Sequence, residues 1–253
     1  MVLSKVVYNK KINDNYYAMS ISSNDKVLDL KPGNFIMLKT NKNNIAYDPL
    51  LKRTFAVSDI EDNNIVIIYK IVGKGTLNLT YFKKNDVIET SGALGNAFTY
   101  SISNKKIAII AGGIGIAPFP LLIKKLSMQK NIIDMYYGGK SKNDIILLDK
   151  FKAIDNILIT TEDGSVGKKG LITEHINSVY DFAFICGPKA MMISAISKLN
   201  ELCEIEVSME ETMACGIGLC MGCIVNFYED TIINKKCCKD GPVFNGRKIL
   251  WKN

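Results

Sequence analysis

The sequence lacks any run of about eighteen or more consecutive apolar residues, the length that a membrane-spanning helix needs. Its start, MVLSKVVYNKKINDNYYAMS, also lacks the apolar stretch and the small-residue cleavage site of a signal peptide. The net charge is only +7, and the lysines are scattered instead of forming a basic stripe with interleaved aromatic residues. These absences argue against a membrane, secreted or nucleic-acid-binding protein, and we expect a cytoplasmic location.

Histidine is nearly absent, whereas cysteine is concentrated near the end of the chain. The single histidine, His175, stands in GLITEHI, where a surface helix position is more plausible than a role as a base. Five of the seven cysteines lie between Cys215 and Cys238. In a reducing compartment this concentration favours a metal or redox site over disulfide bonds.

The hydrophobic pattern divides the chain into three parts. Up to about Phe98, short β-rich runs such as YYAMSIS, RTFAVSD and NNIVIIYKIV alternate with polar turns, which predicts a small antiparallel barrel. From about Lys105, KIAIIAGG reads as a buried strand and APFPLLIKKLSMQK as a helix. NIIDMYYGG, KNDIILLDKF and NILITT continue this alternation, as does DFAFICG followed by PKAMMISAISKLN, so we expect a parallel sheet with helices on both faces.

After about Ser208 the periodicity stops, and a Gly- and Cys-rich stretch leads into a hairpin-like segment. We therefore predict an α+β multidomain protein. Its parts would be an antiparallel β-barrel over residues 1–99, a Rossmann-like α/β domain over 100–208 and a small Cys-rich domain over 209–253.

The cysteine spacing is the most specific signal in the chain. It follows C-x4-C-x2-C with a distant fourth cysteine, which is typical of plant-type [2Fe–2S] sites. A structural zinc site is the alternative, but zinc sites usually use two short knuckles and only one is present here. The predicted ligands are Cys215, Cys220, Cys223 and one of the neighbours Cys237 and Cys238, between which the pattern does not choose.

Two glycine-containing turns indicate a dinucleotide site. IIAGGIGIAP places three glycines between a buried strand and a helix, where backbone N–H groups can approach a pyrophosphate. FICGPKAMM ends another strand at the same carboxyl edge of the sheet. Each has a structural alternative: a plain tight turn for the first, and a buried small residue for Cys186 in the second.

In the barrel half, Arg53 opens a strand and KIVGKGT ends one at Gly73 and Gly75. A cationic side chain and a Gly-flanked helix start suit a diphosphate, although a surface arginine and a loop explain them equally well. The same applies to GALGNAF around Gly92 and Gly95.

Taken together, these segments resemble the ferredoxin reductase superfamily and, more narrowly, the iron–sulfur and FAD subunits of class 1B dihydroorotate dehydrogenases. KIVGKGT, GALGNAF, AGGIGIAP, CGPKAMM, EETMACGIGLCMGC and CCKDGPVF occur in the family's order and span essentially the whole chain. The resemblance implies that Cys238, which precedes KDGPVF, is the fourth cluster ligand. It also implies a flavin-binding barrel, a nucleotide-binding domain and a [2Fe–2S] domain.

The resemblance further assigns binding residues. The family's Arg-Pro-x-Ser flavin motif appears here as Arg53, Thr54, Phe55 and Ala56, so a backbone N–H or Ser58 would have to replace the usual Ser hydroxyl. The remaining implied FAD residues are Lys70, Ile71, Val72, Gly75 and Thr76. The implied NAD residues are Gly112, Gly113, Gly115, Cys186, Gly187 and Pro188, and no catalytic acid or base is implied.

The function implied by the resemblance is electron transfer in de novo pyrimidine (UMP) biosynthesis. Electrons would pass from a separate FMN-containing dihydroorotate dehydrogenase subunit through [2Fe–2S] and FAD to NAD⁺, in a heterotetramer of two subunits of each kind. A related subunit that serves a ferredoxin, a hydrogenase or a sulfur-reducing enzyme is the alternative. A zinc-stabilised module without redox activity is a third reading. NAD is preferred to NADP because only Lys140 and Lys142 follow YYGG as candidates to hold a 2′-phosphate.

Overall fold

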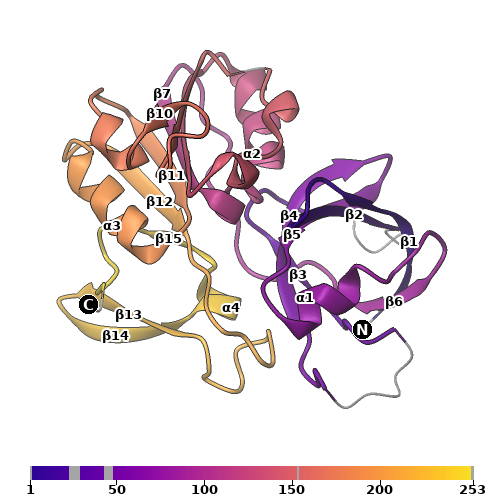
Figure 1. The fold of residues 1–253 in the computed structure, drawn as a ribbon. Helices are drawn as coiled ribbons and strands as arrows, with labels where there is room; N and C mark the ends of the chain where they lie inside the picture. The colour runs from indigo at the N-terminus through magenta and orange to yellow at the C-terminus, as the bar shows by residue number, and fades with distance from the viewer. Residues whose placement is uncertain (1, 23–28, 43–47, 153, 252–253) are drawn as a thin grey trace.

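The computed structural model describes residues 2–22, 29–42, 48–152 and 154–251. It contains a barrel, a larger mixed sheet and a small hairpin domain, in chain order (Figure 1). This arrangement confirms the predicted fold class. No helix within the described ranges is long and apolar enough to cross a membrane.

The first part is a closed antiparallel barrel with the strand order β1-β2-β5-β4-β3-β6. Alternation along the strands builds its interior: on β3, Ile36 and Leu38 point into the barrel core, whereas Phe35 and Met37 point outward into another cluster. A short helix, α1, follows β5. The bounds are β1 Val2–Lys11, β2 Tyr16–Ser22, β3 Phe35–Leu38, β4 Arg53–Glu61, β5 Asn64–Lys70, α1 Lys74–Leu79 and β6 Val87–Thr90.

The second part is a sheet in the order β10-β9-β8-β7-β11-β12-β15, parallel except at its β15 edge. Helix α2 packs on one face of the sheet and α3 on the other, because alternate residues of β7 and β11 join two separate clusters. Both faces are therefore covered, as predicted. The bounds are β7 Lys106–Gly112, α2 Phe119–Leu126, β8 Ile132–Gly139, β9 Asn156–Thr161, β10 Lys168–Lys169, β11 Phe182–Cys186, α3 Lys189–Lys198 and β12 Glu204–Ser208.

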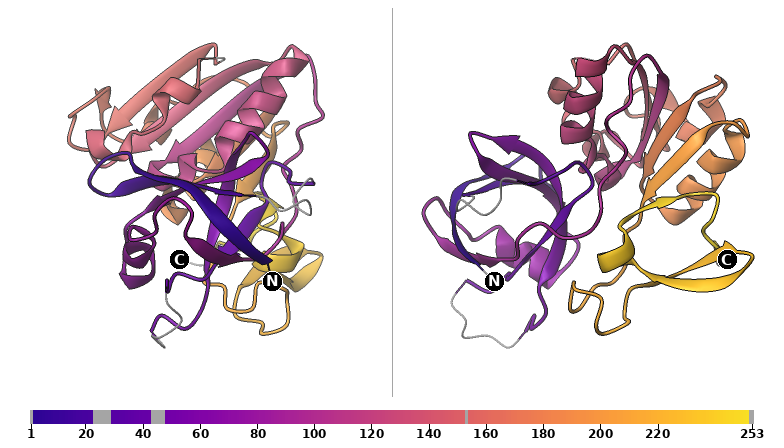
Figure 2. Two further views of the ribbon diagram at one scale, coloured as in Figure 1. Left: turned by 90° about the vertical axis from the view of Figure 1, so that its right-hand side faces the viewer. Right: turned by 180° about the vertical axis from the view of Figure 1, so that it is seen from behind.

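The third part is the predicted hairpin, followed by one helical turn and a last strand. The hairpin and α4 lie below the sheet, and α4 faces the barrel (Figure 2). The last strand leaves this part and pairs antiparallel with β12, which the sequence did not predict. The bounds are β13 Ile224–Glu229, β14 Thr231–Lys236, α4 Cys237–Asp240 and β15 Val243–Asn245.

Three local predictions need correction. KNDIILLDKF forms two single 3₁₀ turns instead of a helix, since Leu147 lies between them at φ 62°, a conformation that a helix cannot contain. The glycine turn after β7 continues as a 3₁₀ turn, Gly113–Ile116, before α2 begins. His175 ends a 3₁₀ turn and not an α-helix, and it is partly buried.

Candidate functional site

The predicted cluster ligands lie on one loop and one helical turn. Cys215, Cys220 and Cys223 occupy the loop between β12 and β13, and Cys238 belongs to α4. The backbone N–H of Cys220 donates to Cys215 Sγ at 3.4 Å, and that of Cys238 donates to Cys223 Sγ at 3.4 Å. Gly218 N–H donates to Cys238 Sγ at 3.1 Å, so the loop and the helical turn face each other.

These four thiols meet as two pairs. The side chains of Cys215 and Cys220 interact with each other, as do those of Cys223 and Cys238, and Cys215 also acts electrostatically on Cys238. In the part of the chain that the structure describes, no three His, Cys, Asp or Glu side chains converge as one metal ion would require. Two thiols at each of two positions are what a binuclear iron cluster requires.

The two pairs differ in electrostatic environment. Hydrogen bonds from the backbone N–H groups of Cys220, Ile217 and Leu219 lower the pKa of Cys215 to about 6. This favours the thiolate form, which is the form that binds a metal. Burial raises the pKa of Cys238 to about 11. One pair is therefore near the surface and the other near the core, as the exposed Cys220 and the buried Cys223 also indicate.

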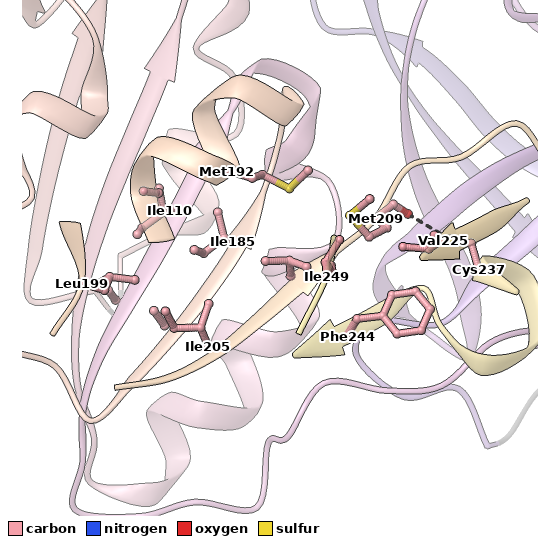
Figure 3. Packing of buried hydrophobic residues seen from close by; sticks show 14 of the residues in the cluster. Ile110, Ile185, Met192, Leu199, Ile205, Met209, Val225, Cys237, Phe244 and Ile249 are labelled. Carbon is pink, nitrogen blue, oxygen red and sulfur yellow. Dashed lines mark hydrogen bonds between the residues drawn. The ribbon is translucent and has the colours of Figure 1, made fainter. Parts of the chain in front are cut away.

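The neighbours Cys237 and Cys238 point in different directions. The Cys237 thiol donates to the backbone oxygen of Met209 at 3.5 Å and lies near Val225 and Phe244 in the interior (Figure 3). Burial raises its pKa far above the usual range. Cys238 instead accepts the N–H of Gly218. The arrangement thus favours Cys238 as the fourth ligand.

A cavity of about 390 Å³ lies where all three parts of the chain meet. From the barrel it is lined by the predicted flavin motif, and from the α/β sheet by Ala117 and Cys186. The segment that leads to the cluster loop closes it with Met209 to Met213. Of the predicted FAD residues, the structure brings these to the cavity wall: Arg53, Thr54, Phe55, Ala56, Lys70, Val72 and Thr76.

Three other residues considered for the flavin lie behind this wall. The N–H of Ile71 donates to Asn15 O, and Gly75 packs beside Arg53, where an added Cβ would lie 3.1 Å from Arg53 Nε. Ser58 is buried and lies outside the lining set, so it does not offer the hydroxyl that Ala56 lacks. The hydroxyl of Thr76 bonds the backbone of Val72 and Gly73 and shapes the turn.

A second cavity, of about 550 Å³, opens along the carboxyl ends of the parallel strands. Four of the predicted NAD residues line it: Gly112, Gly113, Gly187 and Pro188. Gly115 does not line it. An added Cβ there would collide with the carbonyl of Cys186, so this glycine allows the 3₁₀ turn after β7 to approach the end of β11 closely.

Cys186, another of the predicted NAD residues, lines the flavin-side cavity and not the nucleotide-side one, whereas its neighbour Gly187 lines the nucleotide-side cavity. It lies at the end of β11, where burial raises the pKa of its thiol well above the usual range. Its position at the junction of the two cavities still places it between the two predicted cofactors.

A charged contact joins the barrel to the α/β sheet beside both cavities. Lys70 Nζ lies 2.8 Å from Asp144 Oδ1, and the Tyr16 hydroxyl donates to the same oxygen at 2.6 Å. Burial alone would raise the pKa of Asp144, but the hydrogen bonds from Lys70 and Tyr16 outweigh it and hold the pKa below its usual range. Lys70 lines both cavities, so this contact holds it at their junction.

Two residues that line the cavities, Glu210 and Thr160, were not predicted from the sequence. Glu210 lines both cavities and is exposed to them. Desolvation by the surrounding protein nevertheless raises the pKa of its carboxyl. Its position in the sequence, just beyond the end of β12, could have indicated this place, because ligands bind at the carboxyl ends of strands. Thr160 lines the nucleotide-side cavity, and its buried hydroxyl has no hydrogen-bond partner among the described residues.

Two protein-family models match the chain. The model described as the iron-sulfur cluster binding domain of dihydroorotate dehydrogenase B matches residues 210–250. The model described as the oxidoreductase NAD-binding domain matches residues 109–197. The first range contains all four predicted cluster ligands, and the second contains all six predicted NAD residues.

Similar proteins extend this likeness to the whole chain. The electron transfer subunit of dihydroorotate dehydrogenase B (NAD(+)) from Caldanaerobacter subterraneus subsp. tengcongensis is 37% identical, covering 98% of each chain. The protein of the same name from Clostridium acetobutylicum is 35% identical, covering 98% of this chain and 96% of its own. A solved structure of an NADH-dependent reduced ferredoxin-NADP oxidoreductase, described for flavin-based electron bifurcation, has a TM-score of 0.83 and 27% identity. That match covers 99% of this chain and 91% of the other.

Proposed function

This chain belongs to the electron transfer subunits of NAD⁺-dependent dihydroorotate dehydrogenase B, and from that premise we propose that it carries electrons from a catalytic subunit to NAD⁺ in pyrimidine biosynthesis. The observation that carries the proposal is the flavin-side cavity. Its wall combines the barrel, the α/β sheet and the segment leading to the cluster loop. A group bound there would contact the barrel, the α/β sheet and the segment that leads to the cluster loop.

The donor set fits a [2Fe–2S] cluster. Four thiols would hold it, those of Cys215, Cys220, Cys223 and Cys238, which approach one another as two pairs. N–H groups of Gly218, Cys220 and Cys238 already point at three of the sulfurs. Such hydrogen bonds are among the factors that set the reduction potential of a cluster.

The two cavities fit FAD and NAD⁺. Arg53 would hold the flavin diphosphate by charge, while the strand from Thr54 to Ala56 would offer backbone groups to the ring system. On the other side, Gly112, Gly113 and Gly187 leave room for a pyrophosphate to approach the backbone. The Thr160 hydroxyl, which has no partner among the residues that the structure describes, could hydrogen-bond a polar ligand in this cavity.

When bound, the three groups together supply the conversion between hydride exchange in electron pairs and the single-electron exchange of an iron–sulfur cluster. The chain itself would orient these groups and tune them electrostatically. We assign it no acid or base acting on the pyrimidine. We keep the boundaries 1–99, 100–208 and 209–253 as proposed domains, with β15 crossing back into the central sheet.

The subunit name of the relatives implies a partner catalytic subunit. We propose that this partner contains FMN and oxidises dihydroorotate to orotate, and that two subunits of each kind assemble. We also propose a cytoplasmic location, because seven free thiols, four of them proposed cluster ligands, suit a reducing compartment.

The decisive experiment is anaerobic co-expression with a candidate catalytic subunit. We expect the purified complex to contain FAD and about two irons with acid-labile sulfide per copy of this chain. It should reduce NAD⁺ when dihydroorotate is added. A complex with zinc in place of iron, or without flavin after reconstitution, would refute the proposal.

The alternative, a subunit that serves a ferredoxin, a hydrogenase or a sulfur-reducing enzyme, is tested in the same preparation. If the chain holds both cofactors and reacts with NADH but never binds or serves a dihydroorotate-oxidising partner, the redox assignment survives and the pathway assignment fails. The similar dihydroorotate dehydrogenase B subunits favour the pathway assignment.

A further inference from the structure

The barrel contacts the cluster loop through the outward face of strand β3. Along β3, Ile36 and Leu38 point into the barrel, and Phe35 and Met37 belong to the cluster of buried residues that includes Cys223 and Cys238. The neighbouring strand β4 begins with the flavin motif, and Met37 pairs with Thr54 in the β3–β4 register. Strand β3 therefore links the flavin motif on β4 to the cluster loop.

Met37 touches the loop beside the first cluster ligand. A Cβ added to Gly216 would collide with Met37 Sδ and would lie 3.4 Å from Leu94 Cδ1. Gly216 lies at φ +71°, and it immediately follows Cys215. Met37 is only 3% exposed, and its thioether thus fills the space under the loop at Gly216, one of the three glycines between Cys215 and Cys223.

The fourth ligand is held from the same barrel by the segment GALGNAF. Leu94 forms a two-way backbone bridge with Phe35 of β3, at 3.0 and 3.1 Å. Two residues later, Asn96 Nδ2 donates to Val243 O at 2.7 Å and to Asp240 O at 3.3 Å, and Asn96 Oδ1 accepts from Val243 N at 2.9 Å. Asp240 ends the helical turn that carries Cys238.

The two contacts converge on one mechanical role. Both contacts begin at β3, which is hydrogen-bonded to the strand that carries the flavin motif. They reach the two ends of the cluster site, the Cys215 side through Met37 and the Cys238 side through Asn96. Binding sites that must keep a fixed distance and orientation need well-packed residues around them that hold them in place. We propose that Met37 and Asn96 are positioning residues that fix the separation between the flavin site and the cluster site. This inference rests on the proposed function.

The test measures electron transfer inside the reconstituted protein. Stopped-flow mixing with NADH follows flavin bleaching and cluster bleaching at separate wavelengths, and iron and sulfide content are measured for each variant. We expect Met37→Ala to leave flavin bleaching unchanged and to slow cluster bleaching severalfold, because electron transfer slows steeply as the distance between the two redox groups grows. Met37→Leu, which keeps the volume, should restore most of the rate. Asn96→Ala should slow cluster bleaching in the same way.

The matched control is Met19→Ala. Met19 is a fully buried methionine of β2 that packs inside the barrel, away from the cluster loop, so its loss lowers stability without altering the separation. Loss of iron in Met37→Ala but not in Met19→Ala would also support the inference, since the thioether would then be needed to hold the loop. Equal cluster content and equal transfer rates in the two variants would overturn it.

A reciprocal pair removes the remaining ambiguity. Gly216→Ala should lose iron because its Cβ meets Met37 Sδ, and adding Met37→Ala should recover part of that iron. No recovery would mean that the strain at φ +71° alone disrupts the loop, and this would count against the packing contact. A wild-type protein that binds neither flavin nor iron would instead refute the proposed function, so the two failures are distinguishable.

Discussion

Adjacent cysteines in this chain have opposite environments because consecutive residues cannot present their side chains in the same direction. Cys237 contacts Met209 in the interior, and Cys238 accepts an N–H from the loop that carries the other thiols. This difference is tested by replacing each thiol with a hydroxyl of similar shape.

We expect Cys238→Ser to lose most of the bound iron, whereas Cys237→Ser should keep it. The second variant should lose only about 1 kcal/mol of unfolding free energy, because it places a more polar group in the interior. Iron analysis, visible absorption and thermal unfolding measure both effects. Full iron content in Cys238→Ser would contradict the assignment.

The absence of a side chain at Gly115 allows two binding regions to pack closely together. Its Cα packs against the carbonyl of Cys186 without a left-handed backbone, so the constraint is steric alone. We expect Gly115→Ala to cost about 1–3 kcal/mol of stability, as overpacking does, and to weaken NADH binding because the end of β11 must move. Thermal unfolding and NADH titration are the measurements.

Gly92→Ala is the control for this substitution. An added Cβ at Gly92 meets no atom within 4 Å, and this residue also lacks a left-handed backbone. Its stability and NADH affinity should match those of the wild type. If both variants behaved alike, the close approach of Gly115 and Cys186 would have no energetic importance.

Between elements, the most consequential contact joins β5 of the barrel to the turn after β8. Lys70 and Tyr16 hold Asp144 in its charged form, so its pKa is depressed in the folded protein. A depressed carboxyl pKa contributes stability that is fully present above the unfolded value of about 3.9 and is lost as the pH falls through the folded value.

We therefore expect Asp144→Asn to lower the unfolding free energy by about 1–3 kcal/mol near pH 7, because it leaves the partly buried Lys70 without its carboxylate. The difference from wild type should begin to shrink as the pH falls below about 4, where the unfolded carboxyl takes up a proton, and should vanish only below the depressed folded pKa, where the wild-type carboxyl is neutral too. Thermal unfolding at several pH values measures this. Asp149→Asn, on the exposed turn that follows, serves as control, and a pH-independent difference would contradict the ion-pair explanation.

Across the whole molecule, the surface around the cluster loop is unusually apolar for a solvent-facing loop. Ile217, Leu219 and Met221 are 57%, 77% and 53% exposed and surround the exposed thiol of Cys220. Apolar side chains that remain exposed together generally mark a protein interface. Within the proposed function, this surface would face the catalytic subunit.

We expect Leu219→Lys to weaken binding of the catalytic subunit by about 2 kcal/mol, roughly thirtyfold, without changing cluster absorption. Leu202→Lys, at a position that is 91% exposed in the turn between α3 and β12, should bind like the wild type. Titration of the two variants against the partner gives the comparison. Equal affinities would place the interface elsewhere.

Local patterns were enough to predict the order of the barrel, the α/β sheet and the hairpin, the strands of the barrel, and the alternation of strands and helices except at KNDIILLDKF. Each of these depends on residues close together in sequence, such as the nine-residue run from Cys215 to Cys223. Periodicity and ligand spacing are local properties, and backbone geometry converts them directly into faces and loops. The family resemblance added the choice of Cys238 and the nucleotide assignments.

Only the tertiary structure decided which distant segments meet. Asp144 is 74 residues from Lys70, and Met37 lies far from Gly216 in the sequence, so no local pattern encodes either contact. The shift of Cys186 to the flavin-side cavity and the return of β15 to the central sheet have the same origin. The sequence alone determined which groups can bind and where its elements form, whereas packing of those elements determined how far apart the bound groups would lie.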